Sequence, residues 1–132
     1  MSKHVWLVGL AVLLATRPSV AHHSFAPFDL ARNTTLKGTI KEVQFTNPHV
    51  WLQVLLPADR SGQIEWSIEA GAPGMLLRTG WKVNSLKPGD AVTIVMHPAK
   101  NGDHTGSLVS VTTSDGRTLG PGGGAPAVKP KS

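Results

Sequence analysis

The sequence predicts an all-β protein, built as a small OB-like five-stranded barrel with one short helix between the third and fourth strands. Five segments alternate apolar and polar residues with the period of two that is typical of half-buried strands. The elements follow one another as three strands, a short helical stretch and two strands, which is the order of an OB-fold. A small β-sandwich is the alternative architecture.

The first predicted strand is long and changes phase. Within residues 34–45, Leu36 and Ile40 share one face of the strand, whereas Val43 is out of step with them. An out-of-phase step inside a strand indicates a β-bulge, which we expect near Lys41-Glu42. Such a bulge would bend the strand.

The later elements are separated by short stretches rich in Gly, Pro, Asn and Asp, which are typical of turns. Pro73 suits the first turn of the helix and Gly80 suits the position just after its end, while Trp66 and Trp81 are expected in the core. The other predicted strands and turns are a turn at 47–48, strands at 49–56 and 63–69, a turn at 87–90, a strand at 91–97, a turn at 100–103, a strand at 107–113 and a hairpin turn at 114–117 into a short return strand at 118–119.

The N-terminal segment predicts export. A short polar start is followed by a continuous apolar run at residues 5–15, and Ser19-Val20-Ala21 supplies the small residues that a signal peptidase reads. The run is shorter than the roughly 20 residues that a membrane-spanning helix needs. We therefore expect residues 1–21 to be a signal peptide and the mature protein, periplasmic or secreted, to begin at His22 with no membrane anchor after cleavage.

Composition bounds the rest of the chain. We expect an N-terminal arm at residues 22–33, one β domain at 34–119, and a Gly/Pro-rich tail at 120–132 that has little to bury and should be disordered. The chain contains no cysteine, which excludes disulfides, thiolate chemistry and acylation of a cysteine.

The net charge of +5 does not predict a nucleic-acid partner. Four of the 13 Lys and Arg residues fall in the predicted leader or tail, which leaves nine basic residues against the eight acidic ones. These nine are scattered singly among acidic residues, whereas a nucleic-acid binder shows a clustered basic stripe. We therefore expect no nucleic acid among the partners.

Seven segments of the chain are distinctive when taken together: His22-His23-Ser24-Phe25, Leu36-Lys37-Gly38-Thr39-Ile40, Thr46-Asn47-Pro48-His49-Val50-Trp51, Gly80-Trp81, Leu86-Lys87-Pro88-Gly89-Asp90, Ser110-Val111-Thr112 and Asp115-Gly116-Arg117. With these segments the chain resembles a bacterial family of short exported proteins of unknown function. The resemblance implies a single small exported β domain and no particular biochemical activity. One departure is the start of the helix, Gly71-Ala72-Pro73-Gly74, where a small polar residue is expected before the proline.

The histidines provide one candidate metal site. Signal-peptide cleavage would leave His22 with an α-amine and an imidazole, which can chelate Cu(II), with Ni(II) or Zn(II) as alternatives. A further nitrogen could come from His23, from His49 at the start of the second strand, or from His97 at the end of the fourth; His104 is another candidate. The cofactor is otherwise unknown, and copper is the metal that these donors would favour. The alternative is that these histidines are structural or follow the cleavage site by chance.

Trp51 provides a candidate binding face, to which Phe25 and Phe28 of the N-terminal arm would contribute. In the strand at 49–56 it lies on the side opposite the core, together with His49. A Trp in this position could stack on a sugar or a base. The alternative is that Trp51 covers the barrel beneath the arm, against Phe25 or Phe28.

The carboxylates do not predict catalysis. Glu65 and Glu69 share a face of the third strand about 13 Å apart, from a rise of 3.3 Å per residue, which is too wide for a catalytic pair. We expect a solvated face. The sequence also contains no nucleophile elbow, P-loop, Rossmann glycine pattern or zinc-protease motif.

The function predicted from the sequence is an exported, soluble binding or accessory module of unknown ligand, and not an enzyme. Its partner would be a periplasmic protein or a metal ion. Two alternatives remain open: a periplasmic copper-type protein that uses the mature N-terminal His22, and a small metal-dependent enzyme or enzyme subunit.

Overall fold

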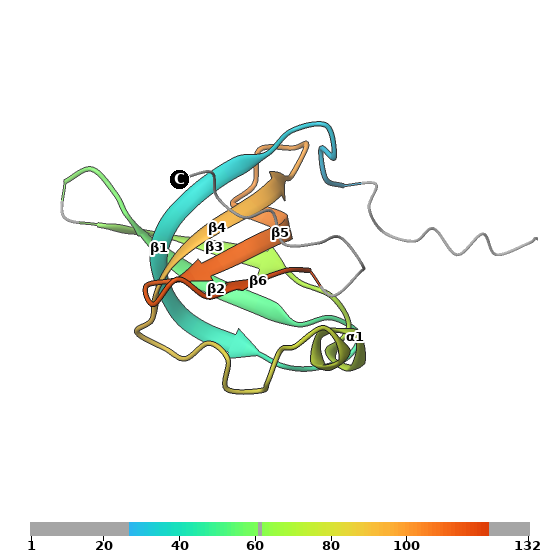
Figure 1. Cartoon of the computed structure of the whole chain (residues 1–132). Helices are drawn as coiled ribbons and strands as arrows, with labels where there is room; N and C mark the ends of the chain where they lie inside the picture. Colours follow the sequence, from blue (N-terminus) through green and yellow to red (C-terminus); the bar gives the residue numbers. More distant parts are fainter. Residues whose placement is uncertain (1–26, 61, 122–132) are drawn as a thin grey trace, which may run out of the picture.

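Six strands and one short helix make up the regular structure of residues 27–60 and 62–121, the part of the chain that the computed structural model describes (Figure 1). The expectations about the signal peptide, its cleavage site and most of the tail lie outside these residues. The elements are β1 Thr34–Gln44, β2 Trp51–Pro57, β3 Gln63–Glu69, α1 Pro73–Arg78, β4 Ala91–Pro98, β5 Thr105–Thr113 and β6 Thr118–Leu119.

Five of the strands close into a barrel. The sheet order is β3-β2-β1-β4-β5-β6 with antiparallel neighbours, and an additional parallel pairing of β3 with β5 joins its two sides. That closing pairing sets Ser67 opposite Thr105 and Glu69 opposite Ser107. The predicted OB-like barrel, with its helix between β3 and β4, is therefore confirmed. The short β6 extends the sheet beside the end of β5.

β1 is long because it pairs with two neighbours. Its first half pairs with β4 and its second half pairs with β2, and Thr39 takes part in both ladders. The register with β2 shifts between Ile40 and Glu42, so that the predicted bulge is confirmed. Because of this bulge, Lys41 and Glu42 are both exposed, and the curved β1 ribbon wraps one side of the barrel (Figure 1).

Gly38 lies where β1 passes from one neighbour to the other. A Cβ at this position would lie 2.5 Å from the carbonyl oxygen of Leu55 and 2.9 Å from Cγ1 of Val54. Contacts this short require the backbone to shift, so that only glycine fits where these strands approach each other.

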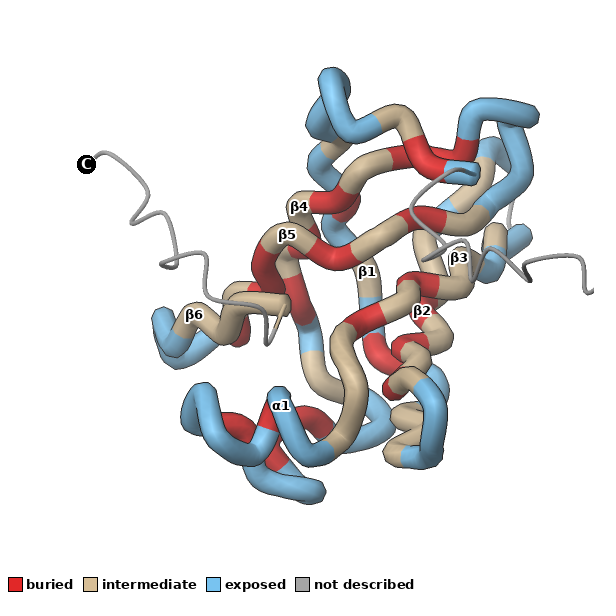
Figure 2. Tube along the Cα trace, turned by 90° about the vertical axis from the view of Figure 1, so that its right-hand side faces the viewer, coloured by how far each residue is buried: buried red, intermediate tan, exposed pale blue. Residues whose placement is uncertain are grey.

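The core fills the inside of the barrel with side chains from the five barrel strands. The buried residues are the red bands along these strands in Figure 2. Leu52 and Val54 of β2 and Ile68 of β3 are fully buried, while the residues between them face outward. The largest fully buried side chains are Ile40, Leu52, Ile68, Leu76, Ile94, Met96, Val50, Val54 and Val111.

The helix α1 lies across one end of the barrel and ends in a Schellman motif. The backbone N–H of Trp81 donates to the carbonyl of Leu76 at 3.1 Å, and that of Gly80 donates to Leu77 at 3.5 Å. Gly80 has a φ of 103°, as its predicted place after the helix requires, and Trp81 is buried in the core. At the other end Ala72 provides no side-chain cap. No helix in the described part of the chain is long and apolar enough to cross a membrane.

The described chain ends by packing against this same end of the barrel. The indole N–H of Trp81 donates to the carbonyl of Gly120 at 2.8 Å. The carbonyl oxygen of Pro121 lies 2.5 Å from where a Cβ of Gly71 would be. The first two residues of the predicted tail therefore contact the domain, and its remaining residues lie outside the described part.

Candidate functional site

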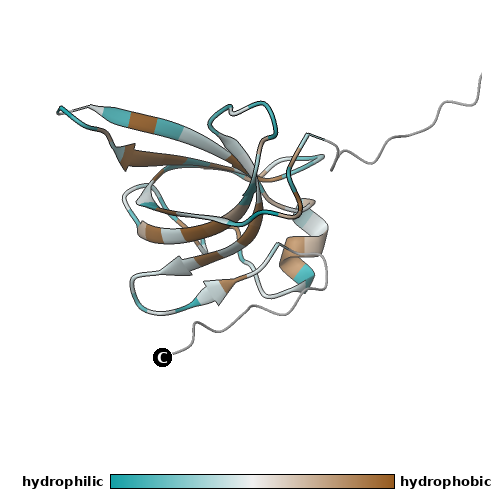
Figure 3. Cartoon of the chain, turned by 90° about the horizontal axis from the view of Figure 1, so that it is seen from above, coloured by the Kyte–Doolittle hydropathy of each residue, from teal (hydrophilic) through white to brown (hydrophobic). Residues whose placement is uncertain are grey.

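The outward side chains of β1, β2 and β3 form a continuous surface of paired residues. Along β2 and β3, outward and core-facing residues alternate. In β3 this alternation is also one of hydropathy, visible as teal and brown bands (Figure 3). The strand registers place three outward residues side by side in each of three rows. We call this surface the outer β1–β2–β3 face; its rows are Gln44, Trp51 and Glu69, then Glu42, Gln53 and Ser67, then Thr39, Leu55 and Glu65.

In the first row, Trp51 lies beside a bonded histidine and glutamate. Nδ1 of His49 lies 2.8 Å from Oε1 of Glu69, to which it donates. The Glu69 side chain is only 16% exposed, whereas that of His49 is 38% exposed. The Glu69 carboxylate engages Nδ1 and so orients the His49 ring. Nε2 is therefore the ring nitrogen of His49 that can contact a ligand. Trp51 itself is half-buried and sits directly across from Glu69.

The backbone explains why His49 reaches Glu69. Val50 continues the β2–β3 ladder beyond the assigned strands: its N–H donates to Gly71 at 3.1 Å and its carbonyl accepts from Ala70 at 2.8 Å. His49 is thereby held next to the end of β3.

The second and third rows hold two further side-chain bonds. Oγ of Ser67 donates to Oε1 of Gln53 at 2.6 Å, so that the amide NH₂ of Gln53 remains to donate elsewhere. Nζ of Lys41 lies 2.7 Å from Oε2 of Glu65 and links β1 to β3 across β2. Both of these charged side chains are about half exposed, so that the ion pair contributes at most about 1 kcal/mol.

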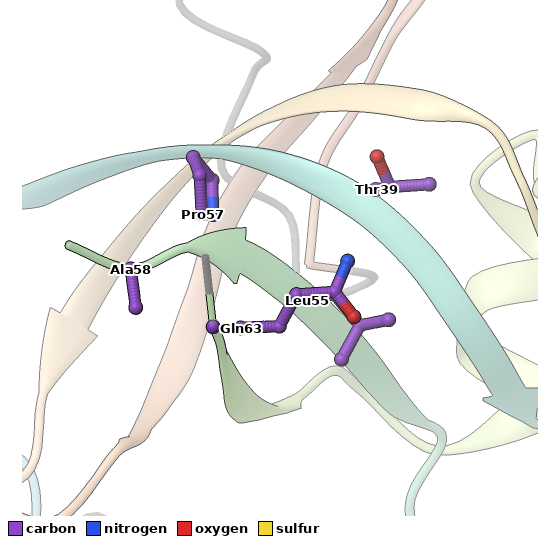
Figure 4. Close-up of a pocket in the computed structure, with 6 residues that line it drawn as sticks. Thr39, Leu55, Pro57, Ala58 and Gln63 are labelled. Atoms are coloured by element: carbon purple, nitrogen blue, oxygen red, sulfur yellow. The ribbon is translucent and has the colours of Figure 1, made fainter. Parts of the chain in front are cut away.

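An open hollow of about 640 Å³ borders the third row. Thr39 and Leu55 belong both to the face and to the lining of this hollow, which is completed by the end of β2 and the start of β3 (Figure 4). The hollow therefore continues the outer β1–β2–β3 face toward the β2–β3 turn. Its lining residues are Thr39, Leu55, Pro57, Ala58, Gly62 and Gln63.

The predicted metal ligands are not brought together in the described part of the chain. His49 bonds to Glu69 on β3, whereas His97 lies on β4 with Nδ1 3.0 Å from the carbonyl oxygen of Arg32. Within residues 27–60 and 62–121, no three His, Cys, Asp or Glu side chains are grouped so that they could hold a metal. His22 and His23 precede the described residues.

His104 contributes to the closure of the barrel. Its ring stacks on Trp66 with a centroid distance of 4.9 Å and an interplanar angle of 27°. Its carbonyl accepts the N–H of Ser67 at 3.0 Å, which supports the closure of β3 on β5. Trp66, predicted as core, is partly buried and packs at the edge of the core cluster.

The described part of the N-terminal arm runs along the end of β4. Phe28 is 5% exposed and pairs with Ala99 as an antiparallel bridge, and the N–H of Lys100 donates to Pro27 at 2.9 Å. The Phe28 side chain therefore anchors the arm instead of offering an exposed binding surface. Trp51 lies on β2, and Phe25 precedes the described residues.

Glu69 is the residue of this face that sequence reasoning assigned incorrectly. It was expected to be a solvated carboxylate, but its side chain is largely covered and bonded to His49. A signal was present: when adjacent strands pair as a hairpin, the residue just before the second strand lies near the end of the third. Glu65, by contrast, is exposed as expected.

Comparison with known proteins defines the family of the chain but not its activity. No curated protein and no solved structure matches the sequence. The model of a family of unknown function, DUF6152, matches residues 11–109. The resemblance to an uncharacterised family is thereby confirmed, while the His-His-Ser-Phe start lies outside the described residues. The chain belongs to the DUF6152 family.

Proposed function

We propose that this chain is an exported binding module, not an enzyme, and that it holds its ligand on the outer β1–β2–β3 face around Trp51. The observation that carries the proposal is the bond from His49 to Glu69 beside the Trp51 side chain. Val50 is part of the core, whereas its outward neighbours His49 and Trp51 are not. The core therefore does not explain why these two residues are present. The corresponding strands of OB-folds are where this architecture binds its ligands.

The groups on the face support binding rather than a reaction. Trp51 offers an aromatic surface, and Gln53, Ser67 and Glu69 offer hydrogen-bonding atoms held by their own side-chain bonds. Such groups orient a ligand without a bond being made or broken.

Amide NMR with a mixed library of small saccharides, nucleotides and peptides tests this proposal. We expect saturable shifts at β2 and β3 amides, and loss of these shifts in Trp51→Ala. A matched control is Val83→Ala, which removes an exposed apolar side chain outside the face. Saturable shifts confined to other surfaces, or their persistence in Trp51→Ala, would refute it.

A second candidate function is copper binding at a mature N-terminal His22. The supporting observation is that Nδ1 of His97 is bonded to the carbonyl of Arg32, on the same arm that would carry His22. Such a bond fixes the ring and leaves Nε2 to ligate, as is common for metal-binding histidines. The pairing of Phe28 with Ala99 makes His97, rather than His49, the third nitrogen that we propose. A metal-dependent enzyme would use these same groups.

Copper titration of correctly cleaved protein tests the second candidate. We expect one Cu(II) per chain, weaker binding as pH falls because the amine and imidazoles must lose protons, and weaker binding in His97→Ala. One residue added before His22 should abolish the N-terminal chelate. Equal affinity with and without that residue would contradict the proposal.

We also propose that the chain is exported and cleaved before His22. The copper titration depends on this cleavage, because it provides the free α-amine of His22. Intact-mass analysis of protein recovered from its host should show a chain that begins at His22. A retained Met1 would contradict export and the copper site together, while leaving the binding face untouched.

A further inference from the structure

We infer that the outer β1–β2–β3 face binds a neutral oligosaccharide, which lies along β2 from Trp51 to the hollow beside Leu55. This inference rests on the proposed function and specifies its ligand class. It follows from the chemistry of the three rows, from their charge, and from the way the face continues into the hollow.

The rows combine an aromatic surface with groups that suit hydroxyls. A sugar ring has an apolar face that packs on an indole and a rim of hydroxyls that both donate and accept. Trp51 provides the indole, the Gln53 amide NH₂ can donate, and the Glu69 carboxylate can accept. The side-chain bonds from Ser67 to Gln53 and from His49 to Glu69 hold these polar groups in place before a ligand arrives.

The charge of the face separates saccharides from nucleic acids, the two ligand classes that OB-folds bind in this region. The rows contain three carboxylates, on Glu42, Glu65 and Glu69, against one ammonium at the bulge, on Lys41, which is bonded to Glu65. A nucleic-acid strand needs cations along its phosphates. This face would repel phosphates, and it would also repel acidic sugars, so that a neutral saccharide fits best.

The extent of the face suits a chain rather than a single sugar. Trp51 and Leu55 are four residues apart on one strand, which corresponds to about 13 Å. Beyond Leu55 the hollow of about 640 Å³ remains open, so that a longer ligand can continue past the rows (Figure 4).

Amide NMR titration with four defined probes tests the inference: cellohexaose, chitohexaose, a hexamer of galacturonic acid and the single strand dT12. We expect at least one of the two neutral hexasaccharides to cause saturable shifts at Trp51, Gln53 and Ser67, with a dissociation constant of about 1 mM or tighter. The acidic hexamer and dT12 should leave these amides unchanged.

Two substitutions localise the site. Trp51→Ala should weaken saccharide binding by about tenfold or more, and Gln53→Met, which keeps the side-chain length but removes its hydrogen bonds, by about threefold. Thr93→Val is the matched control, because Thr93 is a half-buried outward residue of β4 that is not in the three rows. It should bind as the unmodified chain does, and Gln53→Met keeps the test decisive if Trp51→Ala fails to fold.

The outcomes distinguish this inference from the proposed function. If dT12, the acidic hexamer or a library peptide shifts the face and neither neutral hexasaccharide does, the ligand class is wrong and the binding module stands. If neither these four probes nor any member of the mixed library shifts the face, both are wrong. Saccharide binding that Gln53→Met and Trp51→Ala leave unchanged also overturns the inference.

Discussion

Replacing Gly38 with alanine should destabilise the barrel. The new Cβ would lie 2.5 Å from the Leu55 carbonyl oxygen, 2.9 Å from Cγ1 of Val54 and 3.1 Å from Cδ1 of Leu56. The closest of these atoms is backbone in the β1–β2 pair, so that the strands must separate to relieve the contact.

The expected cost follows from these contacts. Added methyl groups in packed sites cost about 1–3 kcal/mol, and the lower chain entropy of alanine in the unfolded state returns about 0.5–1 kcal/mol. The difference spans about 0–2.5 kcal/mol. Because the closest contact is with backbone, we expect a net loss of about 1–2 kcal/mol in the free energy of unfolding. In a domain of this size each kcal/mol lowers the melting temperature by about 4–8 °C.

Urea unfolding followed by tryptophan fluorescence measures the loss, since Trp81 is buried in the core. Gly74→Ala is the matched control: Gly74 is exposed in α1, and its new Cβ would meet only Nη1 of Arg78 at 3.9 Å. That change should be neutral or stabilising by up to about 1 kcal/mol. Equal stability of the two variants would refute the argument that close strand approach requires glycine at Gly38.

Truncation and pH provide the remaining predictions. A chain that ends at Pro121 should keep its melting temperature, whereas one that ends at Leu119 should lose about 1–3 kcal/mol, because the buried indole N–H of Trp81 loses its acceptor; calorimetry on both chains measures the difference. The hydroxyl of Thr113 is the main cause that lowers the pKa of Asp115 from 3.8 to about 2. Because that pKa is depressed in the folded state, the stabilisation is present above pH 3.8 and is lost as pH falls toward 2. Urea unfolding at pH 5, 3 and 2 should therefore show a smaller acid loss in Asp115→Asn, and parallel losses in both proteins would contradict this.

The order of strands and helix along the chain could be predicted because the alternation of apolar and polar residues is visible within each strand. Apolar residues, Ile64, Trp66 and Ile68, alternate with polar ones without interruption along β3, and its predicted bounds are the observed ones. The bulge could be predicted for the same reason, since an extra residue changes the phase of the pattern.

The predicted start of β5 was wrong because a glycine, which has no apolar side chain, faces the core there. β5 begins at Thr105, two residues before the predicted start, because Gly106 continues the strand where the alternation cannot be seen. A Cβ on Gly106 would overlap Sδ of Met96, so that glycine there reflects close packing rather than a turn. A single-sequence pattern cannot distinguish these two causes.

The candidate site was predicted only in part, because its contacts cross strands. The alternation in β2 places Trp51 and His49 on the outward face, but the partner of His49 depends on the register between β2 and β3, which the alternation within one strand does not specify. The arm shows the same limit. The sequence predicts Phe28 in the binding face with Trp51, whereas the long-range pairing with Ala99 buries Phe28 beside β4.

The segments that resemble the family divide into two groups once the contacts are known. Gly80-Trp81 ends α1 and enters the core, and the turn at 87–90 is closed by Asp90, whose carboxylate accepts the N–H of Lys87 at 2.8 Å. These residues are explained by the fold. In His49-Val50-Trp51, the fold explains only Val50, which is fully buried. Neither outward side chain belongs to the core cluster, His49 bonds to Glu69, and Trp51 lies opposite Glu69 in the strand register. For that reason we propose that their face carries the function of this domain.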